Sequence, residues 1–258
     1  NLNAVNGGNV FNGSIQSVDI EGDGNEVESN TVNGIHPSAS AIDVDGESNS
    51  VRSNTIHSNG NGGGIGMAGS GFITGNAIDH VGAGAGVQGT TDVTISGNTI
   101  SYCGTGITVG GTGGNWVDHN TIANCSSEGI FVNGGASNQI HFNTLEHPGN
   151  YGIKMLGSNS NDVANNHITF AGFNGIRLFG SDNNDIISNW IEKSHLEWIL
   201  TDLFSNGNQI LSNNLVCNNA ALDPLRKFSI HIEGPGNLID FNDIHFQPTY
   251  TPTIYAPT

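Results

Sequence analysis

Residues 117–168 read VDHNTIANCSSEGIFVNGGASNQIHFNTLEHPGNYGIKMLGSNSNDVANNHI, and this stretch carries the repeat that decides the fold. The motif at 117–122 (VDHNTI) returns at 140–145 (IHFNTL) and at 163–168 (VANNHI). In each copy the asparagine lies three positions after one aliphatic residue and two positions before another. Self-similarity at a fixed period of about 20 to 50 residues is typical of repeat architectures. The sequence therefore predicts a solenoid.

The motif extends over most of the chain. Its asparagines are Asn30, Asn54, Asn76, Asn98, Asn120, Asn143, Asn166, Asn189, Asn213 and Asn242. A second, looser series is Asn25, Asn49, Asn115, Asn138, Asn161, Asn184, Asn208 and Asn237. A further apolar column comes as alternating pairs, namely Val18/Ile20, Ile42/Val44, Ile65/Met67, Ala85/Val87, Ile107/Val109, Ile130/Val132, Ile153/Met155, Ile176/Leu178, Ile199/Thr201 and Ile230/Ile232.

These columns predict three short parallel strands in each coil. Strand residues alternate between faces, so each column points inward and stacks at about 4.8 Å per coil. The asparagines at the bends can satisfy turn amides that a solenoid would otherwise bury without partners. We expect an all-β, single-stranded parallel β-helix of about ten coils with three sheets and an asparagine ladder. It forms one domain over 1–258, with repeats over about 15–246 and a C-terminal tail at 247–258.

Composition and net charge argue against nucleic acid and membranes as binding partners. Six basic residues against 23 acidic ones give a net charge of −17, which repels nucleic acid and anionic membrane surfaces. No apolar run is long enough to span a membrane, and Asn1 does not begin a signal peptide. The chain is expected to be a mature secreted, extracellular or periplasmic protein, or an excised part of one. We expect no organic cofactor, and the sequence leaves the oligomeric state open.

These repeats resemble those of the pectate-lyase-like superfamily, which includes nitrous-oxide-reductase accessory proteins and mannuronan C5-epimerases. The resemblance covers about residues 15–246. It implies a right-handed β-helix with the asparagine ladder between the second and third sheets. The Gly-Ile-x-Val columns then form the first sheet, across which the substrate of this superfamily lies. The pattern is specific for fold and weak for function, because enzymes and non-catalytic proteins share it.

Two cations on the predicted first sheet form the most informative group. Lys154 and Arg177 hold equivalent positions, so their side chains should emerge about 5 Å apart on adjacent coils. One use of such a pair is to bind an anion between the two charges. The adjoining loops add His147, Tyr151 and His195.

A uronic acid is an anion that suits this group. Removal of the proton beside its carboxylate needs a cation to neutralise charge and a tuned base. The resemblance implies a polyuronate lyase or C5-epimerase, with Tyr151 or His147 as base, Lys154 and Arg177 on the carboxylate, and His195 or Asp202 assisting. The epimerase motif Tyr-Gly-x-Asp-Pro-His is absent.

Surface salt bridges are the alternative reading of Lys154 and Arg177. In that reading Glu146 and Glu192 hold the two cations at the solvated surface, where ion pairs contribute little to stability.

Two outward columns complete the predicted ligand surface. The nearer one is Asp19, Asp43, Gly66, Gly86, Thr108, Phe131, Lys154, Arg177, Leu200 and His231. The farther one is Glu21, Asp45, Ala68, Gln88, Gly110, Asn133, Leu156, Phe179, Asp202 and Glu233. The predicted substrate contacts are Phe131, Asn133, Phe179, Trp198, His231 and Glu233. The aromatic residues are read either as sugar platforms or as cover for an apolar edge.

Four carboxylates gather at the early end of the predicted first sheet. Asp19, Glu21, Asp43 and Asp45 fall on two adjacent coils, where they repel one another unless a cation or protons intervene. The hypothesis is a Ca²⁺ site, because Ca²⁺ prefers oxygen ligands. Two alternatives stay open, a carboxylate pair for glycoside hydrolysis and an acidic surface that aids solubility.

Two further columns are interpreted as parts of the fold without a binding or catalytic role. Cys103 and Cys125 share one inward position and are expected to stack as free thiols. An outward threonine column would suit an ice-binding face, and its members are Thr31, Thr55, Thr99, Thr121 and Thr144. The column beside it contains Asn33, His57, Asp79, Ser101 and Glu146, which breaks the uniformity that a flat ice plane needs.

Two classes of function remain at this point. The favoured class is a carbohydrate-active enzyme on an acidic polysaccharide. The other is a non-catalytic sugar-binding, adhesin or accessory domain of a larger secreted protein.

Overall fold

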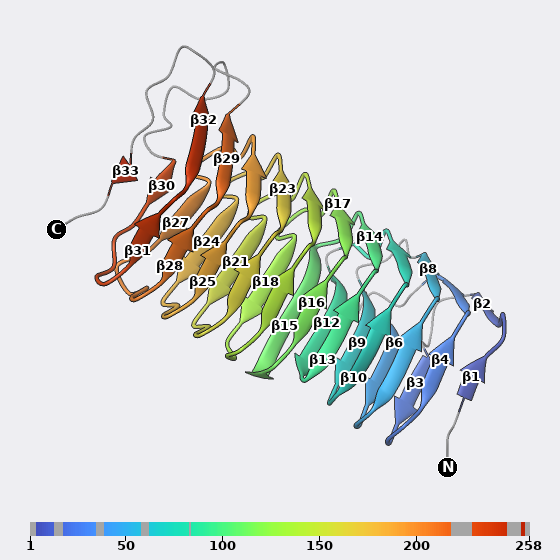
Figure 1. Ribbon diagram of the computed structural model, residues 1–258. Coiled ribbons are helices and arrows are strands. Elements are labelled where there is room, and N and C mark those ends of the chain that lie inside the picture. Colours follow the sequence, from blue (N-terminus) through green and yellow to red (C-terminus); the bar gives the residue numbers. More distant parts are fainter. Residues whose placement is uncertain are drawn as a thin grey trace.

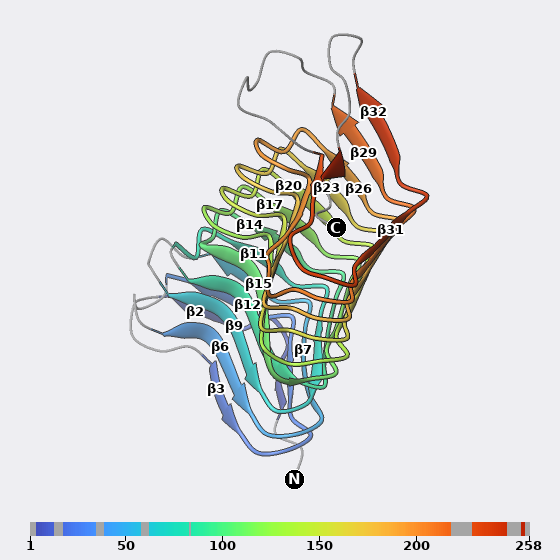
Figure 2. The same cartoon turned by 90° about the vertical axis from the view of Figure 1, so that its left-hand side faces the viewer.

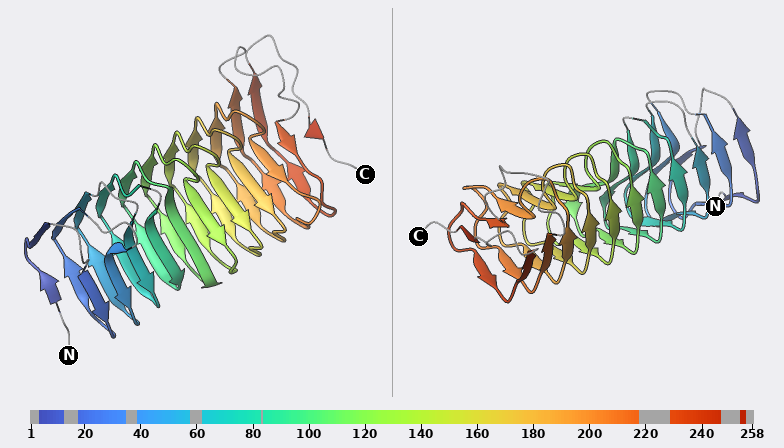
Figure 3. Two further views of the ribbon diagram at one scale, coloured as in Figure 1. Left: turned by 180° about the vertical axis from the view of Figure 1, so that it is seen from behind. Right: turned by 90° about the horizontal axis from the view of Figure 1, so that it is seen from above.

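The computed structural model describes residues 4–12, 18–34, 39–57, 62–82, 84–217, 229–246 and 254–255. Within these ranges the chain forms strands and turns, and no helix is present that could cross a membrane. The strands join in three parallel sheets of eleven strands each, wound into a solenoid (Figure 1). The termini lie at opposite ends of its long axis (Figure 3). The predicted tail at 247–258 lies outside the described residues, apart from 254–255.

Each coil contributes one strand to each sheet, and the bends between sheets stack along the axis (Figure 2). Sheet A contains β1 (Ala4–Asn6), β4 (Glu26–Glu28), β7 (Asn49–Arg52), β10 (Gly71–Thr74), β13 (Val93–Ser96), β16 (Trp116–Asp118), β19 (Gln139–His141), β22 (Asp162–Ala164), β25 (Asp185–Ile187), β28 (Gln209–Leu211) and β31 (Leu238–Asp240). Sheet B contains β2 (Val10–Asn12), β5 (Thr31–Asn33), β8 (Thr55–His57), β11 (Ala77–Asp79), β14 (Thr99–Ser101), β17 (Thr121–Ala123), β20 (Thr144–Glu146), β23 (His167–Thr169), β26 (Trp190–Glu192), β29 (Asn214–Cys217) and β32 (Asp243–Phe246). Sheet C, the first sheet of the sequence prediction, contains β3 (Val18–Glu21), β6 (Ser40–Asp45), β9 (Gly63–Ala68), β12 (Ala85–Thr91), β15 (Thr105–Gly113), β18 (Ile130–Asn133), β21 (Ile153–Leu156), β24 (Ile176–Phe179), β27 (Ile199–Thr201), β30 (Ile230–His231) and β33 (Ile254–Tyr255).

The core consists of apolar columns that run along the inside of the three sheets. In sheet C, Ile130 pairs with Ile153 and Ile153 with Ile176, and all three are fully buried. In sheet A, Val117 pairs with Ile140, again with no exposed surface. Stacking of like side chains in successive coils confirms the predicted columns.

The asparagine ladder lies at the bend between sheets A and B. The backbone N–H and the side-chain Nδ2 of Asn98 both donate to Oδ1 of Asn120 at 2.9 Å. Asn120 Nδ2 donates in turn to Ile95 O at 2.9 Å and to Asn143 Oδ1 at 3.0 Å. The same pattern runs from Asn30 to Asn242. The ladder predicted from the sequence is confirmed.

The second asparagine series lies at the bend between sheets C and A and is interrupted. Asn49 pairs in register with Gly71, and Gly71 pairs with Val93. Val93 N–H donates to Asn115 Oδ1 at 3.1 Å, and the ladder resumes from there. Gly71 has a φ of 152°, and a Cβ there would lie 2.1 Å from Asn49 O. Glycine at this position is therefore required by both backbone angle and space.

A column of glycines brings sheet C close to sheet B. A Cβ added to Gly152 would lie 2.4 Å from Ile168 Cγ2 and 2.5 Å from the carbonyl oxygen of Gly175. A side chain at this column would therefore overpack the core. The column comprises Gly64, Gly86, Gly106, Gly129, Gly152 and Gly175.

Strand β12 departs from the predicted register. Val87 pairs with Ile65 and Gly89 with Met67, so the prediction that placed Ala85 opposite Ile65 was wrong by two residues. The glycine at the second inward position has no side chain to mark its face in the sequence. The residue that pairs with Gly66 in the nearer outward column is therefore Gln88, where the prediction had Gly86.

The two stacked cysteines are buried and free. Cys103 and Cys125 form no disulfide, as expected. The hydrogen bond with Cys125, together with burial, raises the pKa of the Cys103 thiol. Both act as small apolar side chains of the core.

Candidate functional site

Lys154 and Arg177 lie side by side on the outer face of sheet C. They are directly paired between β21 and β24, as predicted. Their neighbours Ile153 and Met155 point inward and are fully buried, while both cationic side chains are half-buried. Partial burial strengthens the field of the two charges relative to freely solvated side chains.

A buried glutamate that the sequence analysis did not select holds Lys154. Lys154 Nζ lies 3.3 Å from Glu128 Oε1, with the glutamate side chain only 9% exposed. Glu128 Oε2 accepts hydrogen bonds from Ser127 Oγ at 2.5 Å and from Thr105 Oγ1 at 3.2 Å. Burial raises the pKa of Glu128, but the hydrogen bonds from Ser127 and Thr105 and the charge of Lys154 outweigh it and lower the pKa. Glu128 is therefore an anion at neutral pH.

The surface salt-bridge interpretation assigned Glu146 and Glu192 to the Lys154 and Arg177 pair and did not include Glu128. The partner of Lys154 is Glu128, and Glu192, one of the two glutamates expected there, instead lies 3.5 Å from His167 Nε2 and 3.8 Å from Lys193 Nζ. Glu192 lies at the end of β26 in sheet B, whereas Lys154 is on sheet C. Sequence spacing alone did not resolve which sheet each loop glutamate faces.

One column of polar residues borders sheet C, immediately before the glycine column. Backbone hydrogen bonds link its members in order, from Gly106 N to Glu128 O, from Gly129 N to Tyr151 O, and from Gly152 N to Asn174 O. Its residues are Thr105, Glu128, Tyr151, Asn174 and Glu197. From this column, Glu128 and Tyr151 contact Lys154.

Arg177 lies within a group of negative residues. Burial lowers the pKa of Arg177, and the charges of Asp202, Tyr151, Glu233 and Glu197 oppose that effect. These residues belong to three different coils. Arg177 therefore remains charged at neutral pH.

Aromatic rings pack against both cations. Lys154 Nζ lies 5.0 Å from the centre of the Phe131 ring and 5.4 Å from that of Tyr151. Arg177 Cζ lies 4.0 Å from the centre of the Phe179 ring. Cation–π contacts of this kind hold the charged groups in place. We call Glu128, Tyr151, Lys154, Arg177 and Phe179 the sheet C cluster.

The two histidines predicted for this site lie in the connections that lead into sheet C. His147 follows β20, and its ring stacks on the Phe170 ring with centres 4.5 Å apart. Lys193 Nζ lies 4.6 Å from the centre of the same Phe170 ring. His195 is exposed in the connection before β27, where its N–H donates to Ala171 O at 2.8 Å. The structure places both on the path from sheet B to sheet C.

Asp202 has a structural role in a turn. Its Oδ1 accepts hydrogen bonds from Gly180 N at 3.1 Å, Phe204 N at 3.2 Å and Ser205 Oγ at 2.7 Å. Three donors hold this carboxylate oxygen in place. Asp202 still contributes a negative charge beside Arg177.

The predicted substrate contacts divide into two groups. Phe131 is half-buried and Asn133 exposed on β18, and His231 Nε2 lies 3.4 Å from Glu233 Oε1 beyond Arg177. These residues line the outer face of sheet C. Trp198, by contrast, is fully buried, so its prediction as a substrate platform was wrong. It stands one coil beyond Gly175, where the glycine column ends, and its ring fills the core.

The four early carboxylates have the predicted register. Asp19 pairs with Asp43 and Glu21 with Asp45. Burial, followed by the charges of Asp45 and Asp19, raises the pKa of Asp43. The Ca²⁺ hypothesis stays a prediction.

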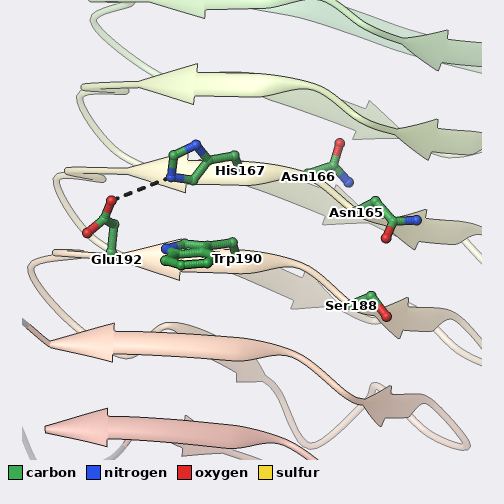
Figure 4. A pocket seen from close by; sticks show the side chains of 6 residues that line it. All are labelled: Asn165, Asn166, His167, Ser188, Trp190 and Glu192. Atoms are coloured by element: carbon green, nitrogen blue, oxygen red, sulfur yellow. Dashed lines mark ion pairs between the residues drawn. The ribbon is translucent and has the colours of Figure 1, made fainter.

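Sheet B carries a separate hollow (Figure 4). His167 and Trp190 stand beside each other there, with ring centres 6.0 Å apart, and Glu192 Oε1 lies 3.5 Å from His167 Nε2. Trp190 is 47% exposed, which leaves an aromatic surface open to solvent. Because the hollow is on sheet B, it is distinct from the sheet C cluster.

The comparisons with known proteins agree with this architecture. The family described as "Right handed beta helix region" matches residues 4–145 and, in an overlapping second match, residues 83–244. This chain belongs to the right-handed β-helix family. No curated protein matches it in sequence.

Solved structures resemble this β-helix at low sequence identity. A mutant DFA-IIIase from Arthrobacter chlorophenolicus A6 in complex with DFA-III aligns with a TM-score of 0.65 and 13% identity, over 92% of this chain and 74% of that chain. The mannuronan C-5 epimerase AlgE6 A-module of Azotobacter vinelandii aligns with a TM-score of 0.60 and 12% identity, over 97% and 88%. The Dettilon tailspike protein aligns with a TM-score of 0.61 and 18% identity, and this chain spans 61% of its length. At such identities the likeness shows the fold alone.

The predicted Ca²⁺ site at the early end of sheet C can be tested by thermal unfolding. If Asp19, Glu21, Asp43 and Asp45 share a cation, Ca²⁺ should stabilise the fold by about 2.7 kcal/mol at 100 times its Kd. The double variant Asp43→Asn with Asp45→Asn should lose the resulting rise in Tm.

The matched control removes two acidic charges elsewhere. Asp162 and Asp185 are paired on sheet A, so changing both to asparagine alters the net charge equally. This control should keep the Ca²⁺ response. A response that survives in the first double variant removes these carboxylates as a site.

Proposed function

We propose that this β-helix binds an extended acidic polysaccharide along sheet C and acts on it as a polyuronate lyase or C5-epimerase. The observation that carries the proposal is the direct pairing of Lys154 with Arg177, with the Tyr151 ring 5.4 Å from Lys154 Nζ. Two cations and a phenol at one point on an otherwise acidic chain suit an anionic sugar and the removal of its proton.

Each side chain has a role in this proposal. The uronate carboxylate lies between Lys154 and Arg177, which neutralise the negative charge that develops when the C5 proton leaves. The Tyr151 oxygen, as a phenolate, accepts that proton and becomes a phenol. In elimination the C4–O bond to the neighbouring sugar then breaks, and the leaving oxygen keeps the electron pair and takes up a proton from solvent. In epimerisation C5 takes up a proton from solvent on the opposite face. Glu128 and Phe179 position the two cations through the contacts described above.

The outer face of sheet C offers a path for the rest of the ligand. Phe131 and Asn133 lie one coil before Lys154, and His231 and Glu233 lie beyond Arg177. Coils repeat at about 4.8 Å, which lets successive sugar units meet successive coils. Aromatic and hydrogen-bonding side chains are both present along this path, as sugar recognition requires.

Binding tests the charge recognition. Calorimetric titration with oligoalginate and oligogalacturonate should show that Lys154→Ala and Arg177→Ala each weaken binding by about 1.5 to 3 kcal/mol, the range for a charged hydrogen bond. The affinity for a neutral oligosaccharide should be the same in both variants as in the unmodified chain. Unchanged affinity of both variants for the acidic oligosaccharides would contradict the proposal.

Arg52 provides the matched control. It pairs with Glu26 and Glu28 on sheet A, so Arg52→Ala removes the same charge from a different face. Its affinity for oligouronates should equal that of the unmodified chain. Equal losses in the control and in Arg177→Ala would indicate an effect of net charge alone.

Activity assays separate catalysis from binding. A lyase forms an unsaturated uronate that absorbs in the ultraviolet, and an epimerase exchanges the C5 proton with deuterated solvent. Tyr151→Phe should abolish either signal while preserving binding, because it removes only the oxygen that accepts the proton. Binding without either signal supports the non-catalytic sugar-binding alternative.

A second candidate is glycoside hydrolysis. It is favoured by the acidic residues around Arg177, since two suitably spaced carboxylates are the usual machinery of glycosidases. It predicts release of reducing ends from neutral oligosaccharides and its loss in Glu197→Gln or Glu233→Gln.

A further inference from the structure

A second group of converging side chains lies on sheet B, three to four coils before Lys154. His57 Nδ1 is 2.7 Å from Asp79 Oδ1, and His80 Nδ1 is 3.1 Å from Asp79 Oδ2. All three donor atoms lie within 4.8 Å of one another. Among the described residues, no other group of three histidine, cysteine or acidic side chains meets that distance.

The backbone brings these three residues together by two routes. His57 ends β8 and Asp79 ends β11, and the two are paired directly across the sheet. His80 follows Asp79 with a φ of 54°, a left-handed conformation that few residues adopt. The chain therefore turns immediately after the strand, which sets His80 against the carboxylate beside it.

Ring packing restricts the two imidazoles. The His80 ring stacks on Tyr102 with centres 4.7 Å apart and an angle of 21°, and the His57 and His80 rings are 5.4 Å apart. The three side chains keep between 40% and 48% of their surface exposed. The donors are thus held in place while solvent retains access from outside.

We propose that His57, Asp79 and His80 form a binding site for a divalent first-row transition metal ion such as Zn²⁺. Two imidazole nitrogens with one carboxylate suit these ions, whereas Ca²⁺ and Mg²⁺ prefer oxygen ligands. In a tetrahedral zinc site with bonds of about 2.05 Å, ligand atoms lie about 3.3 Å apart. Each histidine nitrogen lies 2.7 or 3.1 Å from an Asp79 oxygen, and one ligand atom from each residue lies within 4.8 Å of the others, so modest side-chain adjustments would give this spacing.

The remaining coordination positions face solvent. A hollow on the outer surface of sheet B is lined by His57 and Asp79, together with Thr55, Thr99 and Ser101. Water or a ligand oxygen can complete the coordination there, as in zinc sites with three protein ligands. This site does not depend on the function proposed for sheet C.

Zinc titration of the full chain tests the site. After treatment with a chelator, the protein should bind one Zn²⁺ in calorimetry, and Zn²⁺ should raise its Tm through linkage. His57→Ala and His80→Ala should each weaken binding at least about tenfold, since even outer partners of metal ligands change affinity by about 10- to 100-fold. Ca²⁺ at the same concentration should not displace Zn²⁺.

His119 supplies the control. Its Nδ1 lies 2.8 Å from Asp118 Oδ2, and within the described part of the chain no third histidine, cysteine or acidic side chain completes a group of three with this pair. His119→Ala should leave zinc affinity unchanged. The site is refuted if the unmodified chain binds no zinc, or if His119→Ala weakens binding as much as both other variants. The circular dichroism of each metal-free variant verifies that it is folded, and two independent ligand variants keep the test decisive if one is not.

Discussion

Ile153→Asp should lower the free energy of unfolding by at least about 4 kcal/mol. The change deletes a fully buried aliphatic side chain, which typically costs about 2 to 5 kcal/mol, and adds an unpaired buried carboxylate. Ile153 stacks between Ile130 and Ile176, so the charge would face apolar side chains in the coils on both sides. Thermal or chemical denaturation followed by circular dichroism measures the loss.

The same substitution on the same strand provides the control. Leu156 points outward from β21 and is 42% exposed. Leu156→Asp should change stability by no more than about 0.5 kcal/mol, as surface substitutions usually do. Comparable losses in the two variants would show that the assignment of inward and outward faces in sheet C is wrong.

Asn120→Ala should lower the free energy of unfolding by about 3 kcal/mol or more. The side chain accepts two hydrogen bonds from Asn98 and donates one each to Ile95 O and Asn143 Oδ1. A buried polar group left without a partner costs about 1 to 3 kcal/mol, and the substitution leaves the two Asn98 donors and Ile95 O without this partner. Denaturant unfolding of the two proteins measures the difference.

Asn133 serves as the comparison for this variant. It is also an asparagine in the same coil region, but its side chain is exposed on sheet C. Asn133→Ala should leave the unfolding midpoint nearly unchanged. If Asn120→Ala behaved in the same way, the ladder would not contribute measurably to stability.

The columns of the fold could be predicted because aliphatic side chains and asparagines mark their own faces. The register of β12 could not, since Gly86 and Gly89 carry no side chain that distinguishes inside from outside. The burial of Trp198 was within reach of the sequence. Its position before Ile199 matches that of Gly175 before Ile176, which assigns it to the inward glycine column.

The candidate sites were only partly accessible from the sequence. The pairing of Lys154 with Arg177 follows from strand register, whereas Glu128 depends on the path of the connection that precedes sheet C. On sheet B, the sequence placed His57 and Asp79 in one outward column. No metal site was predicted there, because the left-handed backbone that brings His80 to this pair carries no sequence signal comparable to a glycine.

The asparagine ladder means that the solenoid can change in length only by complete coils. Successive rungs are separated by 22, 23, 24 or 29 residues, yet each makes the same two bonds to the next. Coils can therefore differ in the size of their corners without disturbing their neighbours, and each coil contacts only those directly above and below. A duplication or loss of one complete coil would preserve every type of bond in the ladder. Evolution of this chain can thus lengthen or shorten its sheets in units of one rung, and with them the span of any ligand lying along the axis.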